Sequence, residues 1–146
     1  MRALLIILLS LLALPTLHAT GKKPKVSVSF HLETQGNADN RLAFDYEVMN
    51  QKRVFSNSAV LSEKDFVSFE SFPADDGSYG IVFTIKPDPA ERFVNLLMQA
   101  RGTYMVAQVN GRFVDIVMID RPVADREVVI WRGVTAAEIR EADKLL

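Results

Sequence analysis

An Asn-Gly pair between two apolar runs most constrains how this chain can fold. Asn110 and Gly111 separate residues 104–109 from residues 113–119, and both runs are rich in β-branched and aromatic side chains. Asn-Gly is the pair that most readily adopts the two left-handed conformations of a tight hairpin turn. Because such a turn joins only antiparallel strands, the sequence predicts an antiparallel hairpin here.

Further strands are predicted on both sides of this hairpin. Residues 26–32 alternate between apolar and polar side chains, which is the period of a half-buried strand and places His31 on its solvent-facing side. Residues 42–48 alternate in the same way, and a turn at residues 50–52 leads into a shorter strand at 53–56. Asp76 and Gly77 predict a hairpin turn between residues 67–72 and 79–85. Residues 127–131 form the last strand, which Gly133 ends.

Two helices complete the pattern. Asp88 caps the first, Pro89 is its first residue, and its apolar face comprises Phe93, Leu96, Leu97 and Ala100. Thr135 and Glu138 form a capping box that opens the second helix, and Ser62 with Asp65 predicts a single helical turn. This order of elements predicts an α+β domain in which one mostly antiparallel sheet packs both helices on one face and leaves the other face partly exposed.

The amino terminus has the features of a signal peptide. Arg2 precedes an unbroken apolar run at residues 3–14, and a small residue, Ala19, follows it. The run spans about 18 Å as a helix, which is too short for a bilayer of about 30 Å. We therefore expect a signal peptide at residues 1–19, a flexible leader at 20–25 and a single domain at 26–146, secreted or periplasmic and without a membrane span after cleavage.

Composition excludes several kinds of function. The chain has 17 Lys and Arg and 18 Asp and Glu; removal of Arg2 leaves 16 basic residues and a net charge of about −2, which argues against nucleic-acid binding. The sequence has no cysteine, so disulfides, thiol nucleophiles and thiolate metal sites are absent. His31 is the one imidazole left after cleavage. We predict no cofactor and no metal site.

Four arginines and one tryptophan are the candidate interaction residues. They lie at or between the predicted reversals near the carboxyl-terminal end of the chain, where guanidinium groups can hold an anionic partner and an exposed indole can bind a protein. Trp131 with Tyr104 can form such an exposed binding patch. The alternative is that the arginines pair with neighbouring carboxylates at the surface and that the tryptophan belongs to the core. The candidates are Arg112, Arg121, Arg126, Arg132 and Trp131.

Catalytic and metal-binding alternatives are weaker. Ser27 or Ser29 beside His31 would need a strand–turn–helix elbow to act as a nucleophile, and none surrounds them. The segment 75–77 lacks the regular acidic spacing of a calcium loop. A hydrolase or carbohydrate-active enzyme needs only a carboxylate pair, which the following residues can supply: Asp115, Asp120, Asp125 and Glu127. A third alternative is self-association through an edge strand.

Three segments together resemble the head subdomain of the first periplasmic domain of SecD, a subunit of the SecDF protein-translocation accessory complex. They are an acidic turn entering a strand, a strand followed by a Pro- and Asp-containing helix start with a basic-Phe pair, and an Asn-Gly hairpin followed by a helix opened by Thr-x-x-Glu. In this chain they are residues 60–66, residues 80–93, and residues 105–114 with 133–138.

The resemblance covers about residues 60–140 and implies a shared fold. SecD proteins span the membrane many times, and their energy coupling is attributed to carboxylates in membrane helices that this chain lacks. By analogy, the resemblance implies a surface that contacts extended or partly unfolded polypeptide. We therefore expect a non-enzymatic exported module with a protein partner in the bacterial envelope, as an accessory to protein export or assembly. The hydrolase remains the alternative.

Overall fold

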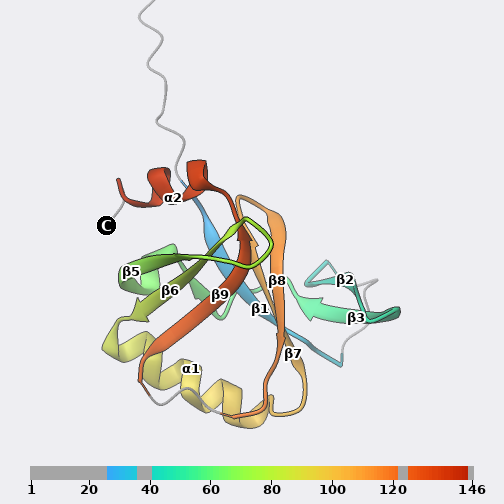
Figure 1. Cartoon of the computed structure of the whole chain (residues 1–146). Coiled ribbons are helices and arrows are strands. Elements are labelled where there is room, and N and C mark those ends of the chain that lie inside the picture. Colours follow the sequence, from blue (N-terminus) through green and yellow to red (C-terminus); the bar gives the residue numbers. More distant parts are fainter. Residues whose placement is uncertain (1–25, 36–40, 122–124, 145–146) are drawn as a thin grey trace, which may run out of the picture.

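The computed structural model describes residues 26–35, 41–121 and 125–144, whose strands form three antiparallel sheets (Figure 1). The predicted signal peptide and leader lie outside these residues. The central sheet has the order β4-β1-β7-β8, the hairpin sheet is β2-β3, and the outer sheet is β5-β6-β9. The predicted α+β class and antiparallel pairing are confirmed, but the pairing is divided among three sheets instead of lying in one. Nothing among the described helices is long and apolar enough to cross a membrane.

The elements follow the predicted order closely. The strands are β1 (Val28–Leu32), β2 (Ala43–Val48), β3 (Gln51–Ser56), β4 (Leu61–Ser62), β5 (Phe66–Pro73), β6 (Tyr79–Ile85), β7 (Tyr104–Val109), β8 (Arg112–Met118) and β9 (Glu127–Val134). A 3₁₀ turn η1 (Glu63–Asp65) and the helices α1 (Pro87–Gln99) and α2 (Ala136–Ala142) complete the fold. The Asn110–Gly111 turn has both residues at positive φ, as predicted.

Two predicted details are wrong. The turn between β2 and β3 lies at Met49 and Asn50, both at positive φ, instead of at residues 50–52. Gly133 does not end the last strand; β9 continues to Val134, and Gly133 adopts a φ of 86° within it. In both places the backbone takes a left-handed conformation that the sequence does not single out.

The main core lies between the central and outer sheets. It is built from the inner faces of β1, β7, β6 and β9, and α1 adds Ala90, Phe93 and Leu97 to it. Ile139 of α2 packs against the same core. Both helices thus cover one core, although they lie at opposite ends of the molecule (Figure 1).

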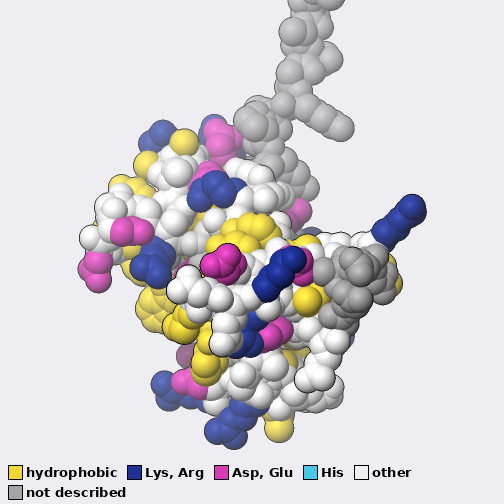
Figure 2. All heavy atoms as spheres, turned by 90° about the vertical axis from the view of Figure 1, so that its right-hand side faces the viewer, with side chains coloured by type: hydrophobic (Ala, Val, Ile, Leu, Met, Phe, Trp, Pro, Cys, Tyr) yellow, Lys and Arg dark blue, Asp and Glu magenta, His cyan; other side chains and the backbone are white. Residues whose placement is uncertain are grey.

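A second, smaller core covers the other face of the central sheet. Phe55 and Val48 of the hairpin sheet pack with Tyr104 and Val106 of β7, and a group of half-buried aromatic residues adjoins them: Phe44, Tyr46 and Phe113. Figure 2 shows hydrophobic side chains gathered on the face of the molecule that carries this hairpin, with charged side chains beside them. The face that we expected to be partly exposed is therefore largely covered.

His31 is the clearest consequence of this covering. It is 7% exposed instead of solvent-facing, and its ring lies edge-on to Phe44. Its Nδ1 donates to the Ser56 carbonyl oxygen at 2.9 Å, so Nε2 of the neutral ring accepts from the Ser29 hydroxyl at 2.9 Å. Burial lowers the pKa of His31, although the bond to the Ser56 carbonyl opposes this shift.

The lowered pKa predicts that acidification destabilises the fold. Below an ordinary histidine pKa of about 6.5 the unfolded chain takes up a proton that the folded His31 resists, so the free energy of unfolding falls as the pH drops from about 7.5 to about 5.5. One such group contributes at most about 1.4 kcal/mol per pH unit. Urea denaturation at several pH values measures this slope, and His31→Gln should flatten it. An equal slope in the variant would contradict the assignment.

Candidate functional site

The free edges of two sheets face one another. Strand β8 is the edge of the central sheet and β9 is the edge of the outer sheet, and among the described residues no backbone ladder joins them. Alternate residues of an antiparallel strand direct their backbone groups to the same side. Since Ile85 N–H donates to Arg126 O, residues 127, 129 and 131 of β9 point away from β6. Since Ile119 N–H donates to Thr103 O, residues 116 and 118 of β8 point away from β7.

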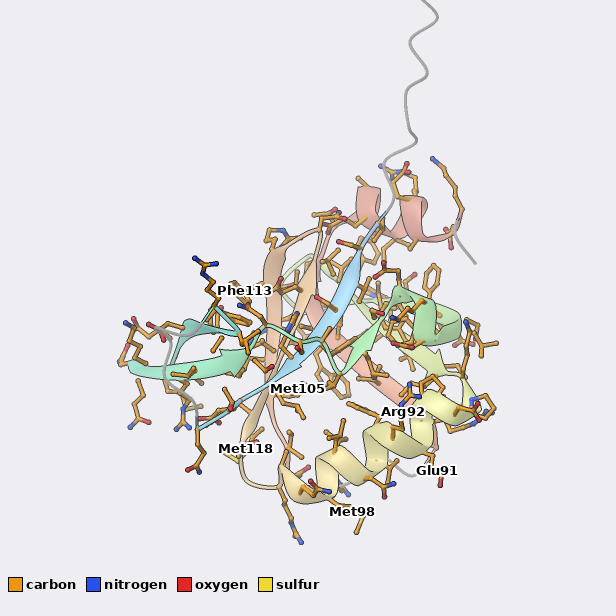
Figure 3. The ribbon with its side chains drawn as sticks, turned by 180° about the vertical axis from the view of Figure 1, so that it is seen from behind. Glu91, Arg92, Met98, Met105, Phe113 and Met118 are labelled. Atoms are coloured by element: carbon orange, nitrogen blue, oxygen red, sulfur yellow. The ribbon has the colours of Figure 1, made fainter. Side chains whose placement is uncertain are left out.

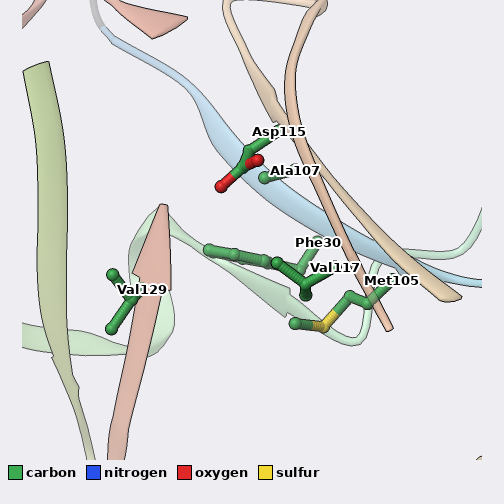
Figure 4. Close-up of a pocket in the computed structure, with 6 residues that line it drawn as sticks. All are labelled: Phe30, Met105, Ala107, Asp115, Val117 and Val129. Carbon is green, nitrogen blue, oxygen red and sulfur yellow. The ribbon is translucent and has the colours of Figure 1, made fainter. Parts of the chain in front are cut away.

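Asp115 bridges the two edges where they come close. Its Oδ2 accepts from the Trp131 N–H at 2.7 Å, and its Oδ1 accepts from the Ile116 N–H at 3.0 Å. One carboxylate therefore satisfies an outward N–H from each strand in place of a backbone ladder. Burial raises the pKa of Asp115, while the two N–H bonds and nearby Arg132 oppose the rise. In Figure 4 this carboxylate stands among the residues of a narrow apolar crevice that include Phe30 and Val129.

Gly133 allows the close approach of the strands beyond Asp115. A Cβ built at this position would lie 2.6 Å from the Val114 carbonyl oxygen. The Gly133 N–H donates to the Ser78 hydroxyl at 2.7 Å, and its carbonyl accepts from Arg112 at 3.0 Å. Near Gly133 the edges of β8 and β9 thus lie too close together to leave an open space between them, and we call this the closed end.

On the other side of Asp115 the two edges border an open groove of about 580 Å³. It is lined mainly by apolar residues of β8, β9, β7 and α1, including Val117, Val129 and Met105. Met118 and Trp131 stand at its border and are 54% and 59% exposed. Figure 3 shows Met118 at the end of β8 near α1. A neighbouring hollow of about 600 Å³ continues past Trp131 to the β5–β6 turn, where Phe72 meets the indole edge-on. We refer to the two together as the β8–β9 groove.

Acidic side chains predominate along the β8–β9 groove. Its lining includes six carboxyl groups, on Asp75, Asp76, Asp115, Asp120, Asp125 and Glu127. Two guanidinium groups accompany them, those of Arg121 and Arg132. Arg121 lies 3.9 Å from Asp120, and both side chains are largely exposed. The rim therefore favours cationic groups on a partner.

The structure brings only some of the predicted interaction residues together. Arg121, Arg132 and Trp131 line the β8–β9 groove. Arg126 is exposed just before β9 and has a positive φ. Arg112 lies at the closed end, where it binds both carboxylate oxygens of Glu138 at 3.0 and 2.8 Å and holds the start of α2. Trp131 is exposed, whereas Tyr104, which we paired with it, is 8% exposed in the second core.

The structure places the residues of the catalytic and metal-binding alternatives in several different surroundings. Ser29 and His31 do form a hydrogen-bonded pair, but they lie beneath the hairpin sheet and neither lines the groove. The segment around Asp76 is a turn in which its Oδ1 accepts from the Ser78 N–H at 3.0 Å. In the described part of the chain, no three His, Asp or Glu side chains gather as a metal ion requires. The carboxylate-pair hypothesis stays a prediction, with all four of its residues along the groove.

Sequence reasoning missed the apolar lining of the groove. The sequence pattern places Val117 and Met118 in a hairpin strand and Val129 in a terminal strand, without indicating that they line a groove. The run of apolar residues at 116–119 and 128–131 signals strands, but only the tertiary arrangement shows that their free edges face each other.

Comparison with known proteins finds resemblance in three dimensions only. No family model matches the sequence, and no curated protein matches it. A solved structure described as "Structure and function of a membrane component SecDF that enhances protein export" is similar, with a TM-score of 0.57 and 14% identity over 81% of this chain and 61% of that chain. A second, "Crystal structure of SecDF in Super-membrane-facing form", has a TM-score of 0.56 and 14% identity over 80% of this chain and 18% of that chain.

These matches confirm the predicted resemblance to SecDF as a likeness of fold. The aligned part is larger than the predicted segment 60–140, so it includes residues before position 60, where no motif of the resemblance was identified. This chain spans about three-fifths of the first matched chain and less than one-fifth of the second.

Proposed function

We propose that this chain is an exported, non-enzymatic module that binds extended or partly unfolded polypeptide in the cell envelope, as an accessory to protein export or assembly there. The observation that supports this most is the β8–β9 groove, where exposed Trp131 and Met118 border an apolar channel beside two free strand edges. Exposed apolar surface of this kind is typical of protein-binding sites. Unfolded segments offer the apolar side chains and free backbone groups that match it.

The geometry of Asp115 favours binding over catalysis. Both of its oxygens accept backbone N–H bonds, so this carboxylate has a structural task in holding β8 and β9 together. A general acid or nucleophile would need at least one oxygen directed at a substrate. The fold likeness adds context, because one matched structure is described as that of a membrane component that enhances protein export.

The test uses protein recovered from the periplasm of an expressing bacterium. We expect it to bind reduced and carboxymethylated lysozyme, which cannot fold, and not native lysozyme. Trp131→Ala should weaken binding by about tenfold or more, since truncating a large exposed aromatic anchor at an interface commonly costs more than 1 kcal/mol. Arg121→Ala and Arg126→Ala report on the arginines that the sequence singled out. Fluorescence anisotropy of the labelled polypeptide measures each affinity.

Met49→Ala is the matched control, because Met49 is 85% exposed at the tip of the hairpin sheet, away from the groove. It should bind as the unchanged protein does. Equal affinity for native and unfolded lysozyme, or no binding of either, would contradict the proposed function.

A further inference from the structure

We propose that the bound polypeptide adds as an extra β-strand to the free edge of β9, with its Lys or Arg side chains held by the acidic rim of the β8–β9 groove. This inference rests on the proposed function and makes its ligand specific. The ligand is an extended segment with alternating apolar side chains flanked by cationic residues.

The backbone of β9 offers the required pairing groups. Glu127 and Val129 direct their N–H and C=O groups away from β6, toward the groove. The next outward N–H, that of Trp131, is already bound by Asp115. Backbone pairing would therefore end before Trp131 and cover residues 127–130, which span about 14 Å in a strand. Main-chain hydrogen bonds of this kind give affinity that does not depend on one particular sequence.

The side chains beside this edge favour an alternating sequence. On β9, Val128 and Ile130 point into the main core, so Val129 and Trp131 lie on the opposite face of the outer sheet. Alternate side chains of an added strand would lie next to Val129 and Trp131 on that face. The intervening side chains would point into the groove, toward Val117 and Met105.

The charge of the groove favours a foreign cationic segment over a second copy of this chain. The lining holds six carboxyl groups and two guanidinium groups. Pairing of two copies edge to edge about a twofold axis would bring one acidic rim against an identical one. A segment that carries Lys or Arg at its ends meets complementary charge instead.

The probe is the end-blocked peptide Lys-Val-Thr-Val-Thr-Val-Lys, and the first readout is hydrogen exchange of the full protein. Binding should slow exchange of the Glu127 and Val129 amides, for which the described residues provide no backbone partner. Val129→Pro removes one outward N–H and leaves the ladder to β6 intact, so we expect peptide affinity to fall by about tenfold or more. The same peptide with Glu in place of Lys should bind at least about tenfold more weakly.

Ser71→Pro is the matched control. Ser71 lies opposite Ile81 on β5, at the other edge of the outer sheet, and its N–H points away from β6 for the same reason of alternation. This variant should bind the peptide normally and report any general cost of an edge proline. Met118→Pro tests the facing edge of β8, where an N–H also points into the groove.

The outcomes separate this inference from the proposed function. If the protein binds neither unfolded lysozyme nor the peptide, both fail. If it binds unfolded lysozyme but Val129→Pro has no effect, or Met118→Pro alone abolishes peptide binding, strand addition to β9 is overturned and the proposed function stands. Protection of the Val129 amide that increases with protein concentration, without peptide, would assign the edge to a second copy and overturn the inference.

Discussion

Replacing Phe83 with alanine is expected to lower the free energy of unfolding by about 3–5 kcal/mol. Phe83 is 2% exposed on β6, stacks on Phe66 with a centroid separation of 4.3 Å, and meets Phe30 of β1 edge-on at 6.4 Å. It therefore joins the outer sheet to the central sheet. Since domains are stable by only about 5–15 kcal/mol, this change removes a large part of the total. Urea denaturation followed by circular dichroism measures the loss.

Val67→Ala provides the comparison within the same sheet. Val67 is 53% exposed on β5, and its truncation should change the stability by no more than about 0.5 kcal/mol. If Phe83→Ala costs no more than Val67→Ala, then the aromatic cluster does not hold the two sheets together.

The second large effect is expected for Gly133→Ala. Alanine at this position would have to adopt a left-handed conformation, which costs a non-glycine residue about 1–2 kcal/mol. Its Cβ would also lie 2.6 Å from the Val114 carbonyl oxygen. Because that oxygen belongs to the backbone, β8 and β9 must separate or the strand must rearrange. We expect a total loss of about 2–4 kcal/mol. The unfolding midpoint in urea measures it.

Gly77→Ala isolates the conformational part of that cost. Gly77 has a φ of 82°, close to that of Gly133, but a Cβ there has no atom within 4 Å. The difference between the two variants is therefore the steric contribution of the β8–β9 approach. Equal losses would show that this approach tolerates a methyl group.

Elements with local signals were predicted well from the sequence. The Asn110–Gly111 turn, the amphipathic face of α1 and the capping box of Thr135 and Glu138 each depend on residues within one or two turns of one another. In that box the Thr135 hydroxyl accepts from the Glu138 N–H, as the spacing predicts. The predicted start of α1 is wrong: the helix begins at Pro87, two residues before Pro89, so Asp88 lies in its first turn and the N-cap is Lys86, which makes no side-chain cap bond.

Features that depend on distant residues were not predicted. The alternation of apolar and polar residues in β1 predicts a solvent-facing His31, which would hold if only one face of the central sheet were covered. The hairpin sheet covers the second face as well, so His31 is buried. The division into three sheets is likewise set by which strands stop pairing, and no local signal marks the free edges of β8 and β9. Three of the predicted interaction residues, Arg121, Arg132 and Trp131, line the β8–β9 groove, whereas its apolar lining was not predicted.

Strand β8 belongs to two packed regions at once. Its Phe113 adjoins the second core beside Phe44 and Tyr46, whereas Val117 packs on the main core and lines the groove. Displacing β8 would disrupt side-chain packing on both sides of the central sheet, so we expect this strand to keep its position when a ligand binds. Strand β9 buries Val128 and Ile130 in the main core, so adjustment to ligands of different bulk falls to the exposed side chains at the border of the groove, Met118 and Trp131.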